Sequence, residues 1–143
     1  MGQCYDPMVS NFKTLVLGAS LKPQRYAYQA VLQLIRNEIE VIPMGLVEGQ
    51  IDSISIIKPF QPLINIHTVT LYLSPHRQQE YYNYIIELKP RRVLFNPGTE
   101  NPEFSQLLTS SRIRWENACT IVLLSTCLLY TSPSPRDRTR SRM

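Results

Sequence analysis

Residues 13–26, with the sequence KTLVLGASLKPQRY, constrain the fold of this chain more than any other stretch. Residues 15–17 form a short apolar run without charges, which is typical of a buried parallel strand. The run ends in Gly18, Ala19 and Ser20, and a helical spacing of apolar residues follows. A strand, a tight turn of small residues and the start of a helix form the geometry that presents free backbone N–H groups to a phosphate.

Two basic residues strengthen this interpretation. Lys22 and Arg25 add fixed positive charge beside the turn. Charge-assisted hydrogen bonds to phosphate are stronger than neutral ones. The stretch therefore predicts a phosphate-bearing ligand at the turn formed by Gly18, Ala19 and Ser20.

Strand-like and helix-like patterns alternate along the rest of the chain. Strands are expected over residues 39–43, 69–73, 92–96 and 113–115, with a weaker candidate over 54–57. Helices are expected over residues 26–35, with Asn37 as a left-handed C-cap, over 75–88 with Ser74 as N-cap, and from Asn101 onward. Residues 118–124 fit a helix or a strand. This alternation predicts an α/β, Rossmann-like three-layer fold, with a mostly parallel sheet of about five strands and helices on both faces.

Three of the five glycines lie just past predicted strand ends: Gly18, Gly45 and Gly98. The carboxyl ends of parallel strands share one edge of the sheet, where open α/β folds bind ligands. Tight turns alone would also place glycines there. The glycines therefore agree with a cleft at this edge without proving it.

Composition limits the other classes of function. The chain of 143 residues carries a net charge of +4, but four arginines and one aspartate belong to residues 127–143, so the rest is nearly neutral. No broad nucleic-acid surface is expected. The three cysteines (Cys4, Cys119 and Cys127) show no CxxC spacing, so neither a disulfide framework nor a metal site is indicated. The longest late apolar stretch, residues 118–130, is too short to span a membrane, and no signal peptide is evident. A cytoplasmic protein is expected.

The two ends differ from the body. Residues 1–12 are expected to form a loose leader, and Asp6 stands where the myristoylation pattern needs Ser or Thr. Residues 127–143 are expected to be a disordered basic tail of non-native, adaptor-like sequence, the alternative being a native tail that binds RNA or acidic lipid. Residues 13–126 are then the folded domain.

Four segments of the chain resemble a known protein family. TLVLGASLKPQRY, IEVIPMG, VTLYLSP and VLFNPGTENPEF are similar to the small stand-alone CoA-binding domain proteins, whose fold is like that of the N-terminal domain of the succinyl-CoA synthetase alpha subunit. The resemblance covers residues 13–126. GAS-x-KP-x-R followed by NPGTENPE, in this order and spacing, carries most of it.

The resemblance implies a site for CoA or an acyl-CoA. Gly18, Ala19 and Ser20 would line the pyrophosphate, and Lys22 and Arg25 would face the phosphates. The remaining residues of the implied cleft border the nucleotide or close its far side: Pro43, Met44, Gly45, Ser74, Pro75, Asn96, Pro97, Gly98, Thr99 and Glu100. The synthetase's phosphorylated histidine belongs to a second domain, for which this chain is too short, so ligase chemistry is not implied.

Two other functions remain open. An enzyme using NAD(P) or another nucleotide could occupy the same cleft, but G-x-G-x-x-G is absent and Pro43, not an acidic residue, ends the second strand. A regulatory protein that senses its ligand is the other alternative. The sequence leaves the acyl group, the pathway and a homodimer undetermined.

No catalytic pair can be identified in the sequence. His67 and His76 have no evident acid or nucleophile partner, so we interpret them as surface or edge residues. Cys119 fits a small packed hydrophobe, although a reactive thiol beside the cleft is an alternative.

Two further groups admit two interpretations. Glu100 either orients the ligand, the interpretation we favour, or complements the next helix's N-terminus. The helical spacing of Tyr81, Tyr82 and Tyr84 favours packing over a stacking platform for a ligand.

Overall fold

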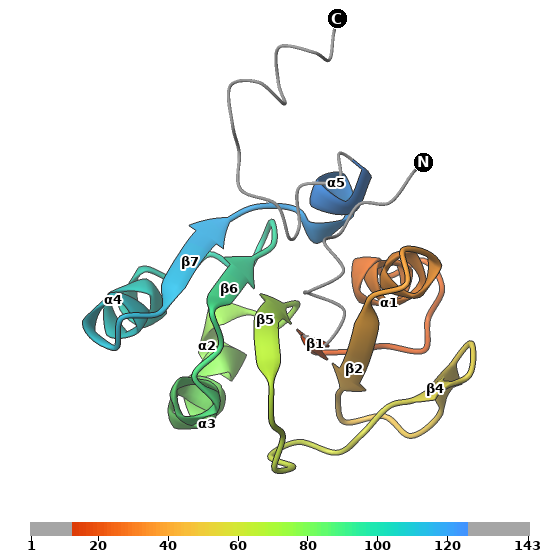
Figure 1. Ribbon diagram of the computed structural model, residues 1–143, viewed down its shortest axis with the longest axis horizontal. Helices are drawn as coiled ribbons and strands as arrows, with labels where there is room; N and C mark the ends of the chain where they lie inside the picture. The colour runs from red at the N-terminus through yellow and green to blue at the C-terminus, as the bar shows by residue number, and fades with distance from the viewer. Residues whose placement is uncertain (1–12, 126–143) are drawn as a thin grey trace, which may run out of the picture.

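A computed structural model of the protein describes residues 13–125 and shows an α/β fold with one main sheet (Figure 1). Five parallel strands lie in the order β2-β1-β5-β6-β7. Their bounds are β1 Lys13–Leu17, β2 Glu40–Met44, β5 Ile66–Leu71, β6 Arg92–Phe95 and β7 Arg114–Asn117. The predicted Rossmann-like class is confirmed.

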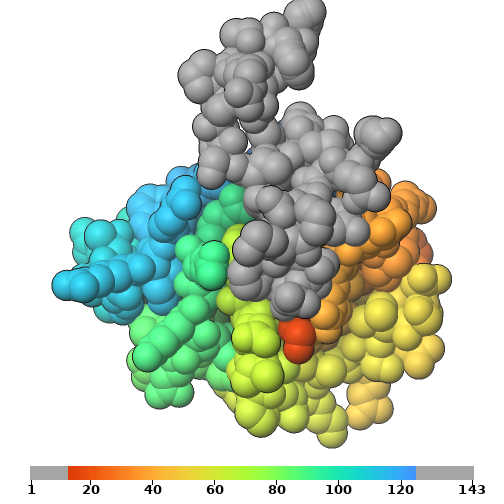
Figure 2. Space-filling model, in the orientation of Figure 1, coloured from red at the N-terminus to blue at the C-terminus, as the bar shows by residue number. Residues whose placement is uncertain are grey.

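Helices cover both faces of the sheet (Figure 1). The first face carries α1 (Tyr26–Arg36) and α5 (Thr120–Ser125), which contact each other. The second face carries α2 (Pro75–Gln78), a 3₁₀ turn η2 (Gln79–Tyr81), α3 (Tyr82–Leu88) and α4 (Pro102–Ser110). In the space-filling view, β7 and α4 form one flank of the molecule and the β3–β4 region the opposite flank (Figure 2).

Alternating residues of the strands feed two hydrophobic cores. On β1, Leu15 and Leu17 join the core beneath α3 and α4, whereas Val16 joins the core beneath α1 and α5. All three side chains are fully buried. A strand buried on both faces needs apolar residues at consecutive positions, which explains the uninterrupted run at residues 15–17.

The chain reverses direction across the sheet beside β1. It goes from β1 through α1 to β2 on one side, and later returns to β5 on the other side of β1. The β3 (Gln50–Ile51) and β4 (Ile54–Ser55) hairpin lies on this return path. The gap between the carboxyl ends of β1 and β5 is therefore the topological switch point, where open α/β folds bind ligands.

Several local predictions need correction. Asn37 ends α1 with a φ of −91°, and the left-handed position falls on Glu38 (φ 60°). The expected helix over 75–88 is divided into α2, η2 and α3, and Ser74 precedes α2 without a side-chain capping bond. The weak strand candidate over 54–57 is one arm of the hairpin. Residues 118–124, left open between helix and strand, contain most of α5.

The expected leader (1–12) and basic tail (127–143) lie outside the described residues, as do Cys4 and Cys127. Within residues 13–125, no helix is long and apolar enough to cross a membrane.

Candidate functional site

A cavity of about 280 Å³ opens at the carboxyl ends of β1, β5 and β6, at the switch point. Three segments surround it: the turn after β1 with the start of α1, the end of β5 with the residues after it, and the turn after β6. Its lining residues are Gly18, Ser20, Arg25, Tyr26, Ala27, Tyr72, Leu73, Ser74, Pro97, Gly98 and Thr99. We call this cavity the switch-point cleft.

Gly18 allows the turn after β1 to pass close to the end of β5. Its φ is +98°, and a Cβ added there would lie 3.1 Å from both the carbonyl carbon and the oxygen of Tyr72. A side chain at this position would therefore be strained by the backbone conformation and crowded by its neighbour.

Two backbone N–H groups of this turn already have hydrogen-bond partners, which the sequence did not reveal. The N–H groups of Gly18 and Ala19 both donate to the carbonyl oxygen of Met44, at 2.9 Å. Gly45 approaches the same turn so closely that an added Cβ would lie 2.7 Å from the Ala19 oxygen. Two of the N–H groups expected to face a phosphate thus bind the end of β2 instead.

The first turn of α1 provides other N–H groups at the cleft. Arg25 is the N-cap residue and makes no side-chain capping bond, while Tyr26 and Ala27 begin the helix and line the cleft with it. The first four N–H groups of a helix have no partner within the helix. Together with the positive end of the helix dipole and the Arg25 guanidinium, they make this wall suited to an anion.

A buried glutamine joins two neighbouring walls of the cleft. Gln78 is fully buried, and its Nε2 donates at 2.8 Å to the carbonyl oxygens of both Leu73 and Thr99. Its Oε1 accepts from Asn101 Nδ2 at 3.0 Å, and Asn101 Oδ1 in turn caps α4 through the Phe104 N–H. The loop after β5 and the turn after β6 are therefore held at a fixed separation.

Asn96 anchors the turn after β6 from below. Its Nδ2 donates to Thr70 Oγ1 at 2.6 Å and to the Leu71 carbonyl at 2.9 Å, and its Oδ1 accepts from the Thr120 N–H at 2.8 Å. Only 2% of Asn96 is exposed. Its amide is fully occupied, so Asn96 shapes the cleft without facing it.

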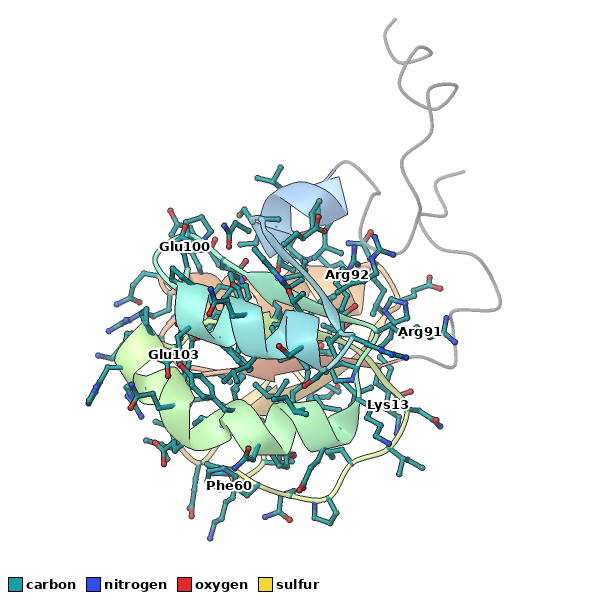
Figure 3. The ribbon with its side chains drawn as sticks, turned by 90° about the vertical axis from the view of Figure 1, so that its left-hand side faces the viewer. Lys13, Phe60, Arg91, Arg92, Glu100 and Glu103 are labelled. Atoms are coloured by element: carbon teal, nitrogen blue, oxygen red, sulfur yellow. The ribbon has the colours of Figure 1, made fainter. Side chains whose placement is uncertain are left out.

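Glu100 lies outside the cleft lining. Its Oε1 accepts from the Gly98 N–H at 2.9 Å, and the residue borders a neighbouring hollow beside α4. In Figure 3 it lies on the same side as Glu103 of α4, away from Lys13, Arg91 and Arg92, which mark the amino ends of the strands. The position agrees with a carboxylate that organises the turn and the start of α4.

Tyr72 forms part of the cleft wall. Burial raises the pKa of its phenol to about 12, an effect that the nearby hydroxyls of Thr120 and Thr70 oppose. The hydroxyl makes no hydrogen bond of good geometry with the described residues. The phenol is therefore neutral near pH 7 and can donate a hydrogen bond, but it is not a base.

The histidine and cysteine candidates lie elsewhere. His67 belongs to the amino end of β5, where its Nδ1 lies 2.7 Å from Thr68 Oγ1. Burial, and then the charges of Arg92, Arg91 and Arg114, lower its pKa to about 4. His76 and the half-buried Cys119 do not line the cleft. Within residues 13–125, no three His, Cys, Asp or Glu side chains form a metal-binding group.

The structure brings together about half of the residues that the sequence singled out. Those in the cleft lining are Gly18, Ser20, Arg25, Ser74, Pro97, Gly98 and Thr99. Those outside it are Ala19, Lys22, Pro43, Met44, Gly45, Pro75, Asn96 and Glu100. Lys22 is exposed, whereas Pro43, Met44 and Gly45 are buried where they support the turn after β1.

Four lining residues were missed: Tyr26, Ala27, Tyr72 and Leu73. Both belong to the expected helix over residues 26–35, in which Ala27 is buried whereas Tyr26 is 70% exposed. Their position as the first two residues of a helix that follows the phosphate turn was the available signal. Tyr72 and Leu73 were placed inside a strand that ends at Leu71.

Comparisons with known proteins bear on the family of the chain. Residues 13–125 match the sequence model of a family described as "CoA binding domain". A search of curated proteins found no match.

Several solved structures have a similar fold. One described as an "uncharacterized protein" is 42% identical, with a TM-score of 0.80, and the match covers 82% of this chain and 98% of that one. A hypothetical protein from Pyrococcus horikoshii OT3 is 22% identical (TM-score 0.75; 85% and 87% covered). A Thermus thermophilus protein is 17% identical (TM-score 0.71; 83% and 91% covered). The last two show likeness of fold alone.

Proposed function

Because the chain belongs to the CoA-binding domain family, whose model matches residues 13–125, we propose that it binds CoA or an acyl-CoA in the switch-point cleft. The observation that carries the proposal is the start of α1. Its uncapped N-terminus and the Arg25 guanidinium meet at the cleft, where a phosphate group of the ligand would receive backbone and side-chain hydrogen bonds.

The size of the cleft defines which part of the ligand it holds. Ligand pockets for molecules of drug size usually span about 300–1,000 Å³. At about 280 Å³ this cavity suits the diphosphate and its immediate neighbours, not a whole CoA molecule. The remainder of the ligand would lie along the surface that adjoins the cleft.

The lining favours binding over chemistry. General acid–base catalysis needs a group whose pKa lies near the working pH and within reach of the reacting proton. Tyr72 is held neutral by its raised pKa, and neither histidine of the described region lines the cleft. We therefore propose a binding protein that holds or carries the ligand.

Isothermal titration of the full chain with CoA, dephospho-CoA and NAD tests this function. We expect heat of binding with CoA, and weaker binding or none with NAD. Absence of binding with all three ligands, or preference for NAD, would contradict the proposal. Native mass spectrometry of the purified protein then shows whether CoA or an acyl-CoA accompanies it.

A further inference from the structure

The strand β7 forms an exposed edge of the sheet. All four of its residues are exposed, and within residues 13–125 it pairs with β6 on one side alone. The opposite edge, β2, is covered at its carboxyl end: the Ile57 N–H donates to the Pro43 oxygen, and the Gly45 N–H donates to the Ile57 oxygen. An exposed edge presents a row of backbone donors and acceptors that can pair with another strand.

The hydrogen bonds to β6 show which backbone groups of β7 face outward. The N–H of Ala118 donates to the Phe95 oxygen at 3.0 Å. In a parallel pair, the backbone groups of every second residue bond to the same neighbouring strand. The backbone N–H and C=O groups of Glu116 and Arg114 therefore also point toward β6. The backbone groups of Trp115 and Asn117 therefore point away from the sheet.

The two faces of β7 carry different kinds of side chain, charged on one face and aromatic on the other. Arg114 and Glu116 share one face, where a Glu116 carboxylate oxygen lies 3.4 Å from Arg92 Nη1. Trp115 lies on the other face, packs edge-on against Phe95, and donates through Nε1 to Thr109 Oγ1 at 3.0 Å.

The surface around Trp115 is hollowed on two sides. A cavity of about 540 Å³ lies between α4 and β7, and another of about 410 Å³ lies between the end of α4 and the start of β7. Trp115 lines both and is 37% exposed, and Leu107 of α4 is 38% exposed. Both hollows belong to the flank that Figure 2 shows in blue.

We propose that β7 pairs antiparallel with β7 of a second copy of this chain, around a two-fold axis through Trp115. Antiparallel strands bond through residues that face each other with outward-pointing backbone groups. That condition permits an axis at any residue from 113 to 117, and forbids one between neighbouring residues.

Charge selects among these five registers. An axis at Arg114 or at Glu116 would place that charged side chain opposite its own copy, which is repulsive. An axis at Ile113 would place Arg112 opposite Arg114 of the second copy, which is repulsive. An axis at Asn117 would place Glu116 opposite Ala118. An axis at Trp115 places Arg114 opposite Glu116 twice, at the closer, non-hydrogen-bonded pair positions, where opposite charges stabilise a sheet.

The two hollows beside β7 add to the surface that a four-residue strand offers for contact. A specific interface usually buries about 800 Å² per partner. The two hollows extend the contact surface along α4 on both sides of the axis. A symmetric dimer of this kind would join two five-stranded sheets into one continuous sheet.

Sedimentation velocity of the full chain over a range of concentrations tests the proposal. The wild type is expected to dimerise, and each single change, Arg114→Glu or Glu116→Arg, is expected to raise the dimer dissociation constant at least about tenfold through two like-charge pairs. Lys58→Glu, an equal charge change on an exposed loop, is the matched control and should leave dimerisation unchanged.

Two further experiments, in which opposite charges face each other again, should restore dimerisation. Mixing the Arg114→Glu chain with the Glu116→Arg chain should form heterodimers, because opposite charges then face each other at both pairs. The double variant Arg114→Glu/Glu116→Arg should form homodimers again. Thermal unfolding of each variant shows whether it is folded, which matters because Glu116→Arg also removes the ion pair with Arg92.

Trp115, the single tryptophan of the chain, gives an independent signal. Its fluorescence should shift to the red on dilution as the dimer dissociates. A wild type that stays monomeric up to millimolar concentration would overturn the proposal. So would a dimer that both single changes leave intact.

Discussion

The side chain of Gln78 lies 2.8 Å from the carbonyl oxygen of Thr99, so a residue of α2 holds the turn after β6. The same nitrogen donates to the Leu73 carbonyl, in the neighbouring wall of the cleft. One buried amide thus fixes two loops that are separate in the sequence.

Replacing Gln78 with leucine should reduce both stability and binding. The change leaves the Leu73 and Thr99 carbonyls without this donor, at a cost of about 1–3 kcal/mol for a buried unsatisfied group. We expect the free energy of unfolding, measured with urea, to fall by roughly 2 kcal/mol or more. Gln79→Leu, at the exposed neighbour, is the control and should change it by less than about 0.5 kcal/mol. Equal losses in the two variants would contradict the role of Gln78.

Arg25→Ala should weaken CoA binding roughly ten- to a hundredfold, the equivalent of one charge-assisted hydrogen bond of about 1.5–3 kcal/mol. Lys22→Ala removes the same charge three residues away, outside the cleft lining, and should change affinity by less than about threefold. Titration calorimetry compares them. If both variants lose affinity equally, the ligand contacts the turn more broadly than we propose.

Comparing the two ligands locates the phosphate that Arg25 binds. A larger loss for CoA than for dephospho-CoA would assign Arg25 to the terminal phosphate. An equal loss for both would assign it to the diphosphate.

Gly18→Ala should destabilise the protein more than Gly98→Ala. Both glycines have left-handed backbones (φ +98° and +93°), so each substitution costs about 1–2 kcal/mol for conformation. Only at Gly18 does the new Cβ also crowd Tyr72 and Leu73, at 3.1 Å, which adds roughly 1–3 kcal/mol. Thermal unfolding of the two variants measures the difference. Similar melting temperatures would show that the turn after β1 can shift to accommodate the added Cβ without loss of stability.

Acid should destabilise the protein through His67. Its pKa is about 4 in the folded protein against 6.5 when unperturbed, so between these values the unfolded chain binds the proton more strongly. The free energy of unfolding therefore falls as pH drops from 6.5 toward 4, while above 6.5 this group has no effect. His67→Gln keeps a partner for Thr68 and should show a smaller decline in urea unfolding across this range. An unchanged pH profile would contradict the depressed pKa.

The sequence was sufficient where the signal is local. The uncharged run at residues 15–17 and the glycine that follows it predicted β1 and its turn, because burial on both faces and a positive φ each leave a direct mark on residue choice. Helix and strand boundaries near residues 71–75 were less certain, since Tyr72 and Leu73 continue the apolar pattern of β5 beyond its end.

The sequence was insufficient where a contact joins distant segments. The N–H groups of Gly18 and Ala19 are occupied by Met44, which lies at the end of another strand. Gln78 binds backbone carbonyls, which carry no residue-specific signal. The contact of Glu100 is local, but it also goes to a backbone group: its carboxylate accepts the N–H of Gly98, two residues earlier in the chain.

The missing side-chain cap of α1 links ligand binding to folding. Natural helices usually begin at a residue whose side chain accepts one of the orphan N–H groups, and loss of that cap costs about 0.5–2 kcal/mol. An anion in the cleft would accept hydrogen bonds from the first N–H groups of α1, in place of a side-chain cap. The same hydrogen bonds would then contribute both to the affinity for the anion and to the stability of the first turn of α1. Amide hydrogen exchange in the first turn of α1 should then slow when the ligand binds, and the melting temperature should rise with ligand concentration. A bound anion would thus complete the first turn of α1.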